Sequence, residues 1–352
     1  MGDKKFLHAD KLRDWLQELS KEFSVYAPQM NGSVQEFAQY TADSEISLDL
    51  LSTEPPKKVL FPQTEYMFRY KYEKSNQDLG GEELQLTEDL PQDKPLIFAC
   101  RPCDAAGFQI FDSVFAQKEI SDPYYKNRRD KACIVSLACT IPDNTCFCNW
   151  VGGGPTDPQG SDVMLFPVQE GYLLEPITDK GEQLLNYKGF ETAGEKATEA
   201  EELKQSSLEK MPQFIDLGDV PQKLLDLFEN MEFWEQVSNK CISCGVCTYL
   251  CPTCYCFNIS DESAGKAGKR IRSWDSCMYF LFTLEASGHN PRSSKAHRLR
   301  NRIGHKFSYH PHNHAGIFAC SGCGRCIKYC PANVDIREVI QLVKEYKDVH
   351  GE

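Results

Sequence analysis

Two copies of one cysteine motif constrain this chain more than any other feature. The first copy, CISCGVCTYLCP, places cysteines at 241, 244, 247 and 251, just before Pro252. The second copy, CSGCGRCIKYCP, places them at 320, 323, 326 and 330, just before Pro331. This C-x2-C-x2-C-x3-C-P spacing is the one with which bacterial proteins hold [4Fe–4S] clusters. The sequence therefore predicts two such clusters, in a region that folds so that the two copies meet.

The motif also predicts which cysteines bind together, because its fourth cysteine ligates the other cluster in two-cluster proteins. Zinc is the rival metal, but zinc ribbons use two C-x2-C pairs per ion and rarely a run closed by proline. The 68 residues between Cys251 and Cys320 exceed the short connection of a compact ferredoxin and favour an α-helical ferredoxin-like domain over 231–352. The predicted ligand sets are Cys241, Cys244, Cys247 and Cys330 for one cluster, and Cys320, Cys323, Cys326 and Cys251 for the other.

Residues 1–230 predict a separate α/β domain with a mixed sheet. Leucines at 12, 16 and 19 recur at near-helical spacing and indicate a first amphipathic helix. The Glu-rich stretch 191–213 predicts a solvated helix or a linker, and Asp335 is a plausible N-cap for a closing helix. Short apolar runs bounded by Pro, Gly or charge predict strands at 59–61, 95–100, 132–139, 163–166 and 171–177.

Nine cysteines lie outside the two motifs. Cys103, Cys139, Cys146 and Cys148 follow two predicted strands, whose ends can bring the four thiols together in the N-terminal domain. A third iron–sulfur cluster, a zinc site and packing thiols all fit this group. Cys100 and Cys133 lie inside strand-like runs, so we expect them to be buried in the core. We expect the remaining three, Cys254, Cys256 and Cys277, to pack near the clusters.

Composition excludes several classes of protein. The 17 cysteines are too few for a disulfide scaffold, and no signal peptide or membrane-spanning apolar run is present, so we expect a cytoplasmic protein without membrane insertion. The net charge of −12 argues against nucleic-acid binding. Residues 266–306 nevertheless hold ten Lys or Arg against Asp275 and Glu285, a local net of +8 (10 minus 2). A solvated basic face, compensation of negatively charged clusters and docking of an acidic partner all explain this segment.

The order of several motifs resembles a known family. RPCDAAG, CTIPDNTCFC, CPTCYCF, WDSC and the second cysteine run together resemble the family that contains the β subunit of cytosolic sulfhydrogenases and the A subunit of anaerobic sulfite reductase. The resemblance implies an electron-transfer subunit between a flavin-containing, NAD(P)H-reactive subunit and a terminal redox subunit, namely a hydrogenase, a sulfite reductase or a heterodisulfide-reductase-like protein. The family motifs include Cys103, Cys139, Cys146 and Cys148.

The sequence offers no competing catalytic machinery. It shows no catalytic acid–base pair or nucleophile, no Walker loop and no GxGxxG after a strand, so we expect any flavin or nicotinamide on another subunit. The prediction is a non-catalytic electron-transfer subunit with two [4Fe–4S] clusters and room for a third. The alternative is a catalytic or redox-sensing iron–sulfur protein whose N-terminal cysteine site binds a sulfur substrate.

Overall fold

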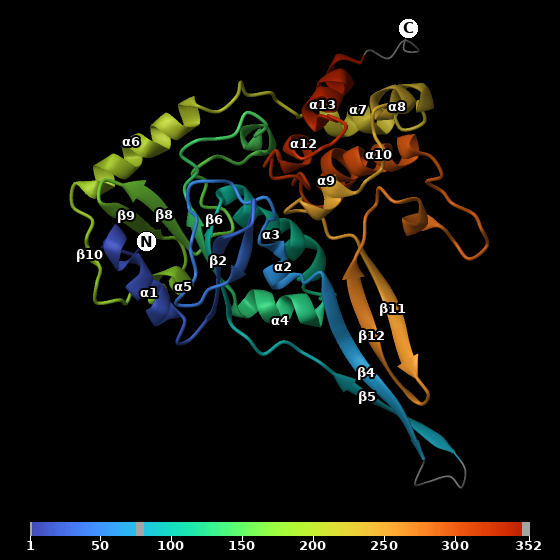
Figure 1. Cartoon of the computed structure of the whole chain (residues 1–352). Coiled ribbons are helices and arrows are strands. Elements are labelled where there is room, and N and C mark those ends of the chain that lie inside the picture. Colours follow the sequence, from blue (N-terminus) through green and yellow to red (C-terminus); the bar gives the residue numbers. More distant parts are fainter. Residues whose placement is uncertain (1, 75–80, 347–352) are drawn as a thin grey trace.

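The N-terminal half is built on an eight-stranded mixed sheet with strand order β10-β1-β9-β8-β7-β6-β2-β3. The computed structural model describes residues 2–74 and 81–346 (Figure 1). Strands β2, β6, β7 and β8 run parallel at the centre, and the outer pairs are antiparallel. The strands are β1 (Lys5–His8), β2 (Ser24–Asn31), β3 (Val34–Gln39), β6 (Pro95–Cys100), β7 (Cys133–Leu137), β8 (Val163–Val168), β9 (Gly171–Pro176) and β10 (Glu191–Thr192).

Helices cover both faces of this sheet because the central strands are apolar on both sides. Leu96 and Phe98 of β6 pack with α1, whereas Ile97, between them in sequence, packs with α3 on the opposite face. The mixed α/β fold predicted for this region is thus confirmed. The prediction of a strand at 59–61 is wrong, because these residues form the end and the C-cap of the short helix α2, which packs against α3. The helices are α1 (Leu12–Leu19), α2 (Lys57–Leu60), α3 (Pro102–Phe115), α4 (Pro123–Lys131), α5 (Asp179–Leu184) and α6 (Lys196–Glu209).

A second, four-stranded antiparallel sheet joins the two halves of the chain. Its order is β11-β12-β4-β5, so the hairpin β4 (Thr64–Lys74) and β5 (Glu82–Glu88) pairs with the hairpin β11 (Phe257–Ala264) and β12 (Ala267–Trp274). Figure 1 shows this sheet extending away from the body as a long arm. The β11–β12 hairpin lies inside the insertion between the cysteine motifs, where the sequence favoured helices.

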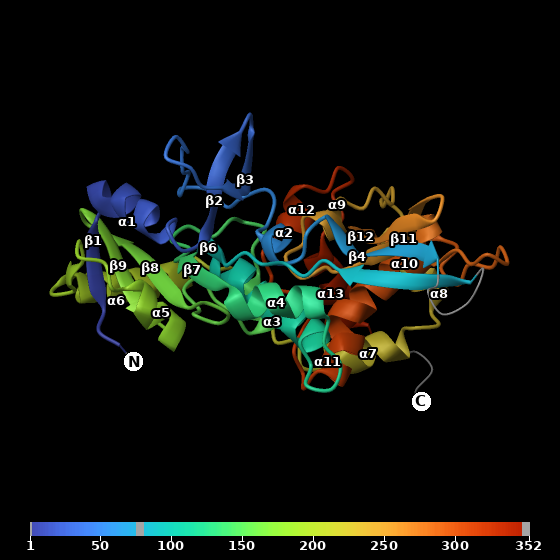
Figure 2. The ribbon, with the colours of Figure 1, turned by 90° about the horizontal axis from the view of Figure 1, so that it is seen from below.

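The rest of the C-terminal half is helical. These short helices share one apolar core, which also takes in Phe147 and Trp150 from the N-terminal half. Figure 2, seen from below, shows α3 and α4 lying between the large sheet and these helices. The helix predicted after Asp335 is present, and the Asp335 carboxylate caps it by accepting from the Arg337 amide. The helices are α7 (Val220–Asp226), α8 (Met231–Ser238), α9 (Val246–Tyr249), α10 (Lys295–Gly304), α11 (His310–Asn313), α12 (Arg325–Lys328) and α13 (Ile336–Glu345).

Candidate metal centres

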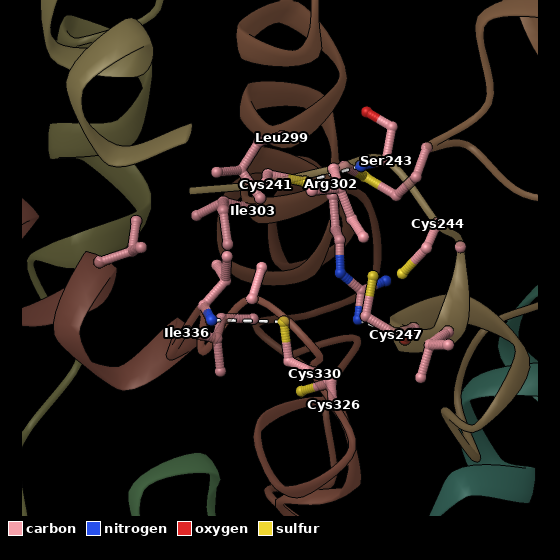
Figure 3. A pocket seen from close by; sticks show the side chains of 17 residues that line it. Cys241, Ser243, Cys244, Cys247, Leu299, Arg302, Ile303, Cys326, Cys330 and Ile336 are labelled. Atoms are coloured by element: carbon pink, nitrogen blue, oxygen red, sulfur yellow. Dashed lines mark hydrogen bonds between the residues drawn. The ribbon is translucent and has the colours of Figure 1, made fainter. Parts of the chain in front are cut away.

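The first predicted ligand set surrounds one cavity. Cys241 and Cys244 approach it from the loop that enters α9, Cys247 approaches from α9 itself, and Cys330 approaches from just beyond α12. Figure 3 shows these four side chains around a common space, with Arg302 reaching in from α10. Most other lining side chains are apolar, for example Leu299, Ile303 and Ile336 of the C-terminal core. Four thiols in an apolar pocket are the donor set and surroundings that a [4Fe–4S] cluster requires.

The second set is deeper in the molecule. Burial raises the pKa of the Cys326 thiol, and the neighbouring thiols of Cys323, Cys320 and Cys251 raise it further against the effect of Arg302. The thiols of the other three predicted ligands therefore lie near enough to Cys326 to affect its pKa. Cys326 also lines the first cavity, so the two sets share a wall.

A glycine at the same position of each motif makes both loops possible. Gly245 and Gly324 precede α9 and α12, and both are left-handed, with φ of +78° and +76°. Side-chain-bearing residues rarely adopt this conformation, which turns the chain so that the cysteines on either side face inward. The two motifs are therefore alike in backbone as well as in spacing.

The N-terminal cysteines line a second cavity, of about 400 Å³. Strands β6 and β7 are parallel neighbours, so Cys103 after β6 and Cys139 after β7 emerge at the same edge of the sheet. The following loop brings Cys146 and Cys148 to the same cavity. Its wall also includes Cys323 of the second set, and the Cys146 sulfur lies 3.7 Å from the Cys323 carbonyl oxygen.

A buried ion pair, which the sequence analysis did not identify, joins the second motif to the N-terminal half. Arg325 of α12 donates to both carboxylate oxygens of Asp104, at 2.6 and 3.0 Å, and both side chains are completely buried. Arg325 also donates to the carbonyl and hydroxyl oxygens of Ser52. In the sequence, Asp104 follows Cys103 in RPCDAAG and Arg325 precedes Cys326 in CSGCGRC. This position next to a ligand candidate is the only feature of the sequence that could have indicated the ion pair.

Buried cations also lie against the cysteines. Lys306 donates to the Cys251 sulfur at 3.4 Å, and Arg302 donates to the Cys254 sulfur at 3.4 Å and to the Cys247 carbonyl at 2.6 Å. Burial opposes the charge of Lys306, but the thiolates of Cys251 and Cys254 outweigh burial and raise its pKa. Lys57 donates to the carbonyls of Thr248 and Cys254, and burial lowers its pKa.

The basic segment 266–306 thus divides by location. Four of its cations pair with carboxylates on or beside the second sheet: Lys266 with Glu82, Lys269 with Glu262, Arg270 with Asp261, and Arg272 with Glu65 and Asp122. Arg302 and Lys306 are instead buried beside cysteines. The first group belongs to the arm, whereas the second is placed to compensate negative charge at a cluster.

The remaining cysteines are distributed as predicted from their positions in the sequence. Cys100 and Cys133 are buried in the core on strands β6 and β7. Cys254 accepts the hydrogen bond from Arg302, and a hydrogen bond from Cys277 lowers the pKa of the Cys256 thiol. Cys256 and Cys277 belong to the same apolar core as the motif cysteines Cys241, Cys247 and Cys326.

The described residues, 2–74 and 81–346, contain neither a site for a single metal ion nor a membrane-spanning helix. No group of three or more His, Cys, Asp or Glu is arranged to hold a single metal ion. No helix there is long and apolar enough to cross a membrane. In a cubane each thiolate binds its own iron, so the ligands stand apart instead of converging on one ion.

Comparison with known proteins gives two matches. Residues 240–334 match the family model of the 4Fe-4S dicluster domain, which covers both cysteine motifs. The chain is 32% identical over 349 residues to sulfhydrogenase 2 subunit beta of Pyrococcus furiosus, a match that covers 96% of this chain and 98% of that protein. No solved structure matches the chain.

Proposed function

Because this chain belongs to the family of sulfhydrogenase beta subunits, we propose that it is the electron-transfer subunit of a cytoplasmic multisubunit oxidoreductase. One partner is a flavin-containing subunit that reacts with NAD(P)H, and the other is a terminal redox subunit: a hydrogenase, a sulfite reductase or a heterodisulfide-reductase-like protein. The flavin and the nicotinamide belong to the partner, and this chain contributes the iron–sulfur sites between the two.

The observation that carries this proposal is that the three cysteine groups adjoin one another. Cys326 belongs to the second set and also lines the first cavity, while Cys323 belongs to the second set and also lines the N-terminal cavity. When bound, iron–sulfur clusters supply one-electron chemistry without proton transfer or a nucleophile. A row of such sites suits a conduit, because an electron entering at one end needs only short steps to leave at the other.

Each group has a proposed role in this conduit. The eight motif cysteines hold two [4Fe–4S] clusters with the exchanged fourth ligands Cys330 and Cys251, and the N-terminal four, Cys103, Cys139, Cys146 and Cys148, hold a third cluster. The buried cations beside the second set support this assignment, because they need negative charge nearby. We divide the chain into an α/β domain over 1–230 and a dicluster domain over 231–352.

Iron and acid-labile sulfide per chain, measured on anaerobically purified protein, test the proposal. We expect about twelve irons, four for each of three cubanes. Cys146→Ala should lose about four of them and one EPR signal. Cys133→Ala, which alters a core thiol outside the two cavities lined by the ligand candidates, should keep all of them. A wild-type content of about eight irons would remove the third cluster, and a content near zero would remove the proposed function.

A further inference from the structure

Arg302 and Lys306 occupy one face of one continuous helical segment. They are four residues apart, where α10 passes into the π-helical turn His305–Tyr309. Residues at this spacing lie on the same side of a helix, and π turns inside α-helices are frequent at functional sites. This side faces the cysteines. Lys306 contacts the Cys251 sulfur, and Arg302 donates to the Cys247 carbonyl of the first set and lines the first cavity together with Cys326 of the second.

Neither cation has a carboxylate partner among the described residues. Lys306 donates its other hydrogen bonds to the Thr253 hydroxyl at 2.9 Å and the Ala319 carbonyl at 2.7 Å, and both groups are neutral. Two other buried arginines differ, since Arg272 pairs with Glu65 and Arg325 pairs with Asp104. The buried Arg101 and Arg298 donate to carbonyl or hydroxyl oxygens, but of the described cations only Arg302 and Lys306 donate to cysteine sulfurs. A buried cation without a compensating negative charge is unfavourable. The nearest groups able to balance these two charges are therefore the cysteine thiolates and whatever they ligate.

We propose that Arg302 and Lys306 are positioning residues that set where an electron rests in the row of clusters. Lys306 stabilises the reduced state of the cluster at the second set alone, whereas Arg302, which lies between the sets, stabilises the reduced states of both. This inference rests on the proposed function, since it needs clusters at both sets. It extends that function by making Lys306 the residue that fixes the difference in potential between them.

The charge balance explains why a nearby cation favours the reduced state of a cluster. A thiolate-ligated cluster carries net negative charge, and taking up one electron from a reductant, here dithionite or the neighbouring reduced cluster, makes that charge more negative by one. A fixed positive charge in a low-dielectric interior favours this step. The donor loses the same electron, so Lys306 shifts the equilibrium between the two clusters towards the second set.

An EPR-monitored reductive titration of the full chain, with iron content measured on the same samples, tests the idea. Lys306→Gln keeps a hydrogen-bond donor for Thr253 and Ala319 but removes the charge. Lys306→Arg keeps the charge. Lys295→Gln, at the exposed start of the same helix, is the control for surface charge. Cys320→Ser identifies the signal of the second set, because it alters a ligand of that set.

We expect Lys306→Gln to keep its iron and to move the signal of the second set to lower potential, while the first stays in place. Lys306→Arg and Lys295→Gln should titrate like the wild type. Unchanged potentials in fully loaded Lys306→Gln, or an equal shift in Lys306→Arg, would overturn the proposal.

If Lys306→Gln fails to assemble its clusters, Arg302→Gln provides the test. Arg302→Gln should lower both potentials, and unchanged potentials in this variant would overturn the proposal. If both Gln variants lose iron, Lys306→Arg and Arg302→Lys become decisive. Iron retained by these charge-keeping variants supports the charge requirement, and iron lost from them as well overturns it. A wild type without clusters at both motifs would instead refute the proposed function.

Discussion

At the scale of single residues, two arrangements of buried charge lie at the cysteine groups. Asp104 and Arg325 balance each other between the two halves of the chain, whereas Lys306 and Arg302 face sulfur. A buried pair contributes little net stability when intact, but removing one partner leaves an uncompensated charge in the interior. The first prediction concerns this asymmetry.

Asp104→Asn should lower the free energy of unfolding by about 3–5 kcal/mol, because it leaves the Arg325 charge buried and unpaired. Urea unfolding of the loaded protein measures this loss. Asp130→Asn breaks the exposed pair with Lys126 and serves as the control, with an expected cost of about 0–1 kcal/mol. Equal midpoints for the two variants would show that the buried pair does not join the halves.

The buried His305 should make the stability of the protein depend on pH. Burial lowers its pKa to about 4, and its Nε2 atom lies 3.0 Å from the Tyr255 hydroxyl. The folded pKa is below the unfolded value of about 6.5, so folding favours the neutral form of His305. The stability that this preference contributes is complete above pH 6.5 and declines as pH falls towards 4. Urea midpoints should therefore fall between about pH 6.5 and pH 5.

The slope of this decline identifies the group responsible. His305→Gln should flatten the dependence, although some slope remains because burial also lowers the pKa of His310. Replacing the exposed His312 with Gln should leave the dependence intact. A wild-type slope in His305→Gln would assign the effect to other groups.

At the scale of elements, the close approach of two loops decides whether the N-terminal cysteines meet the second motif. The Phe147 amide donates to the Gly322 carbonyl at 2.8 Å. Gly322 has a φ of +63°, and a Cβ there would lie 2.5 Å from the backbone of Cys148. Both the backbone conformation and the available space therefore require glycine.

Gly322→Ala should push these loops apart and lower the iron content attributed to Cys146 and Cys148. Gly316→Ala is a matched control, because Gly316 also has a positive φ, +83°, but nothing lies within 4 Å of its added Cβ. Iron analysis and urea unfolding of both variants separate the clash from the backbone strain. An equal loss of iron in the two would attribute the effect to strain alone.

Sequence patterns predicted the elements whose residues form a local signal. Strands β6 to β9 are short apolar runs, and α13 combines an apolar face with its cap Asp335. The run 59–61 is typical of a strand, but its first two residues end α2 and Phe61 is the C-cap. Three apolar residues do not distinguish the two structures. The hairpin β11–β12 had no signal of its own. Its basic residues lie in a strand because β4 pairs with it from 200 residues away.

At the scale of the whole molecule, the cysteine groups lie where the two halves of the chain meet. The spacing rule and the parallel-strand argument predict which cysteines form each group. The first cavity and the N-terminal cavity are lined by the predicted cysteines together with Cys326 and Cys323, respectively. Sequence spacing does not predict that the groups adjoin, because this depends on contacts such as Asp104–Arg325 between segments 221 residues apart. The clusters, if bound, therefore cross-link elements that the sequence presents as separate.

Removing iron should accordingly loosen more than the metal loops. Chelation under anaerobic conditions is expected to lower the helix signal in far-UV circular dichroism and to raise hydrogen exchange in α9, α12 and the loop 139–148. The large sheet has its own apolar core and should stay protected. Full retention of helix signal and protection in iron-free protein would show that these loops are held without metal.

The second sheet also imposes an order on synthesis. Strand β4 ends at residue 74 and its partner β12 begins at residue 267, so 193 further residues (267 minus 74) must be made before the two can pair. At about 5–20 residues per second, ribosomes leave that edge open for about 10–40 s. The second cysteine motif emerges later still. The N-terminal half therefore stays incomplete on the ribosome until its last partners emerge. A cell that makes this protein must protect an open β edge and the twelve proposed ligand thiols until the chain is released.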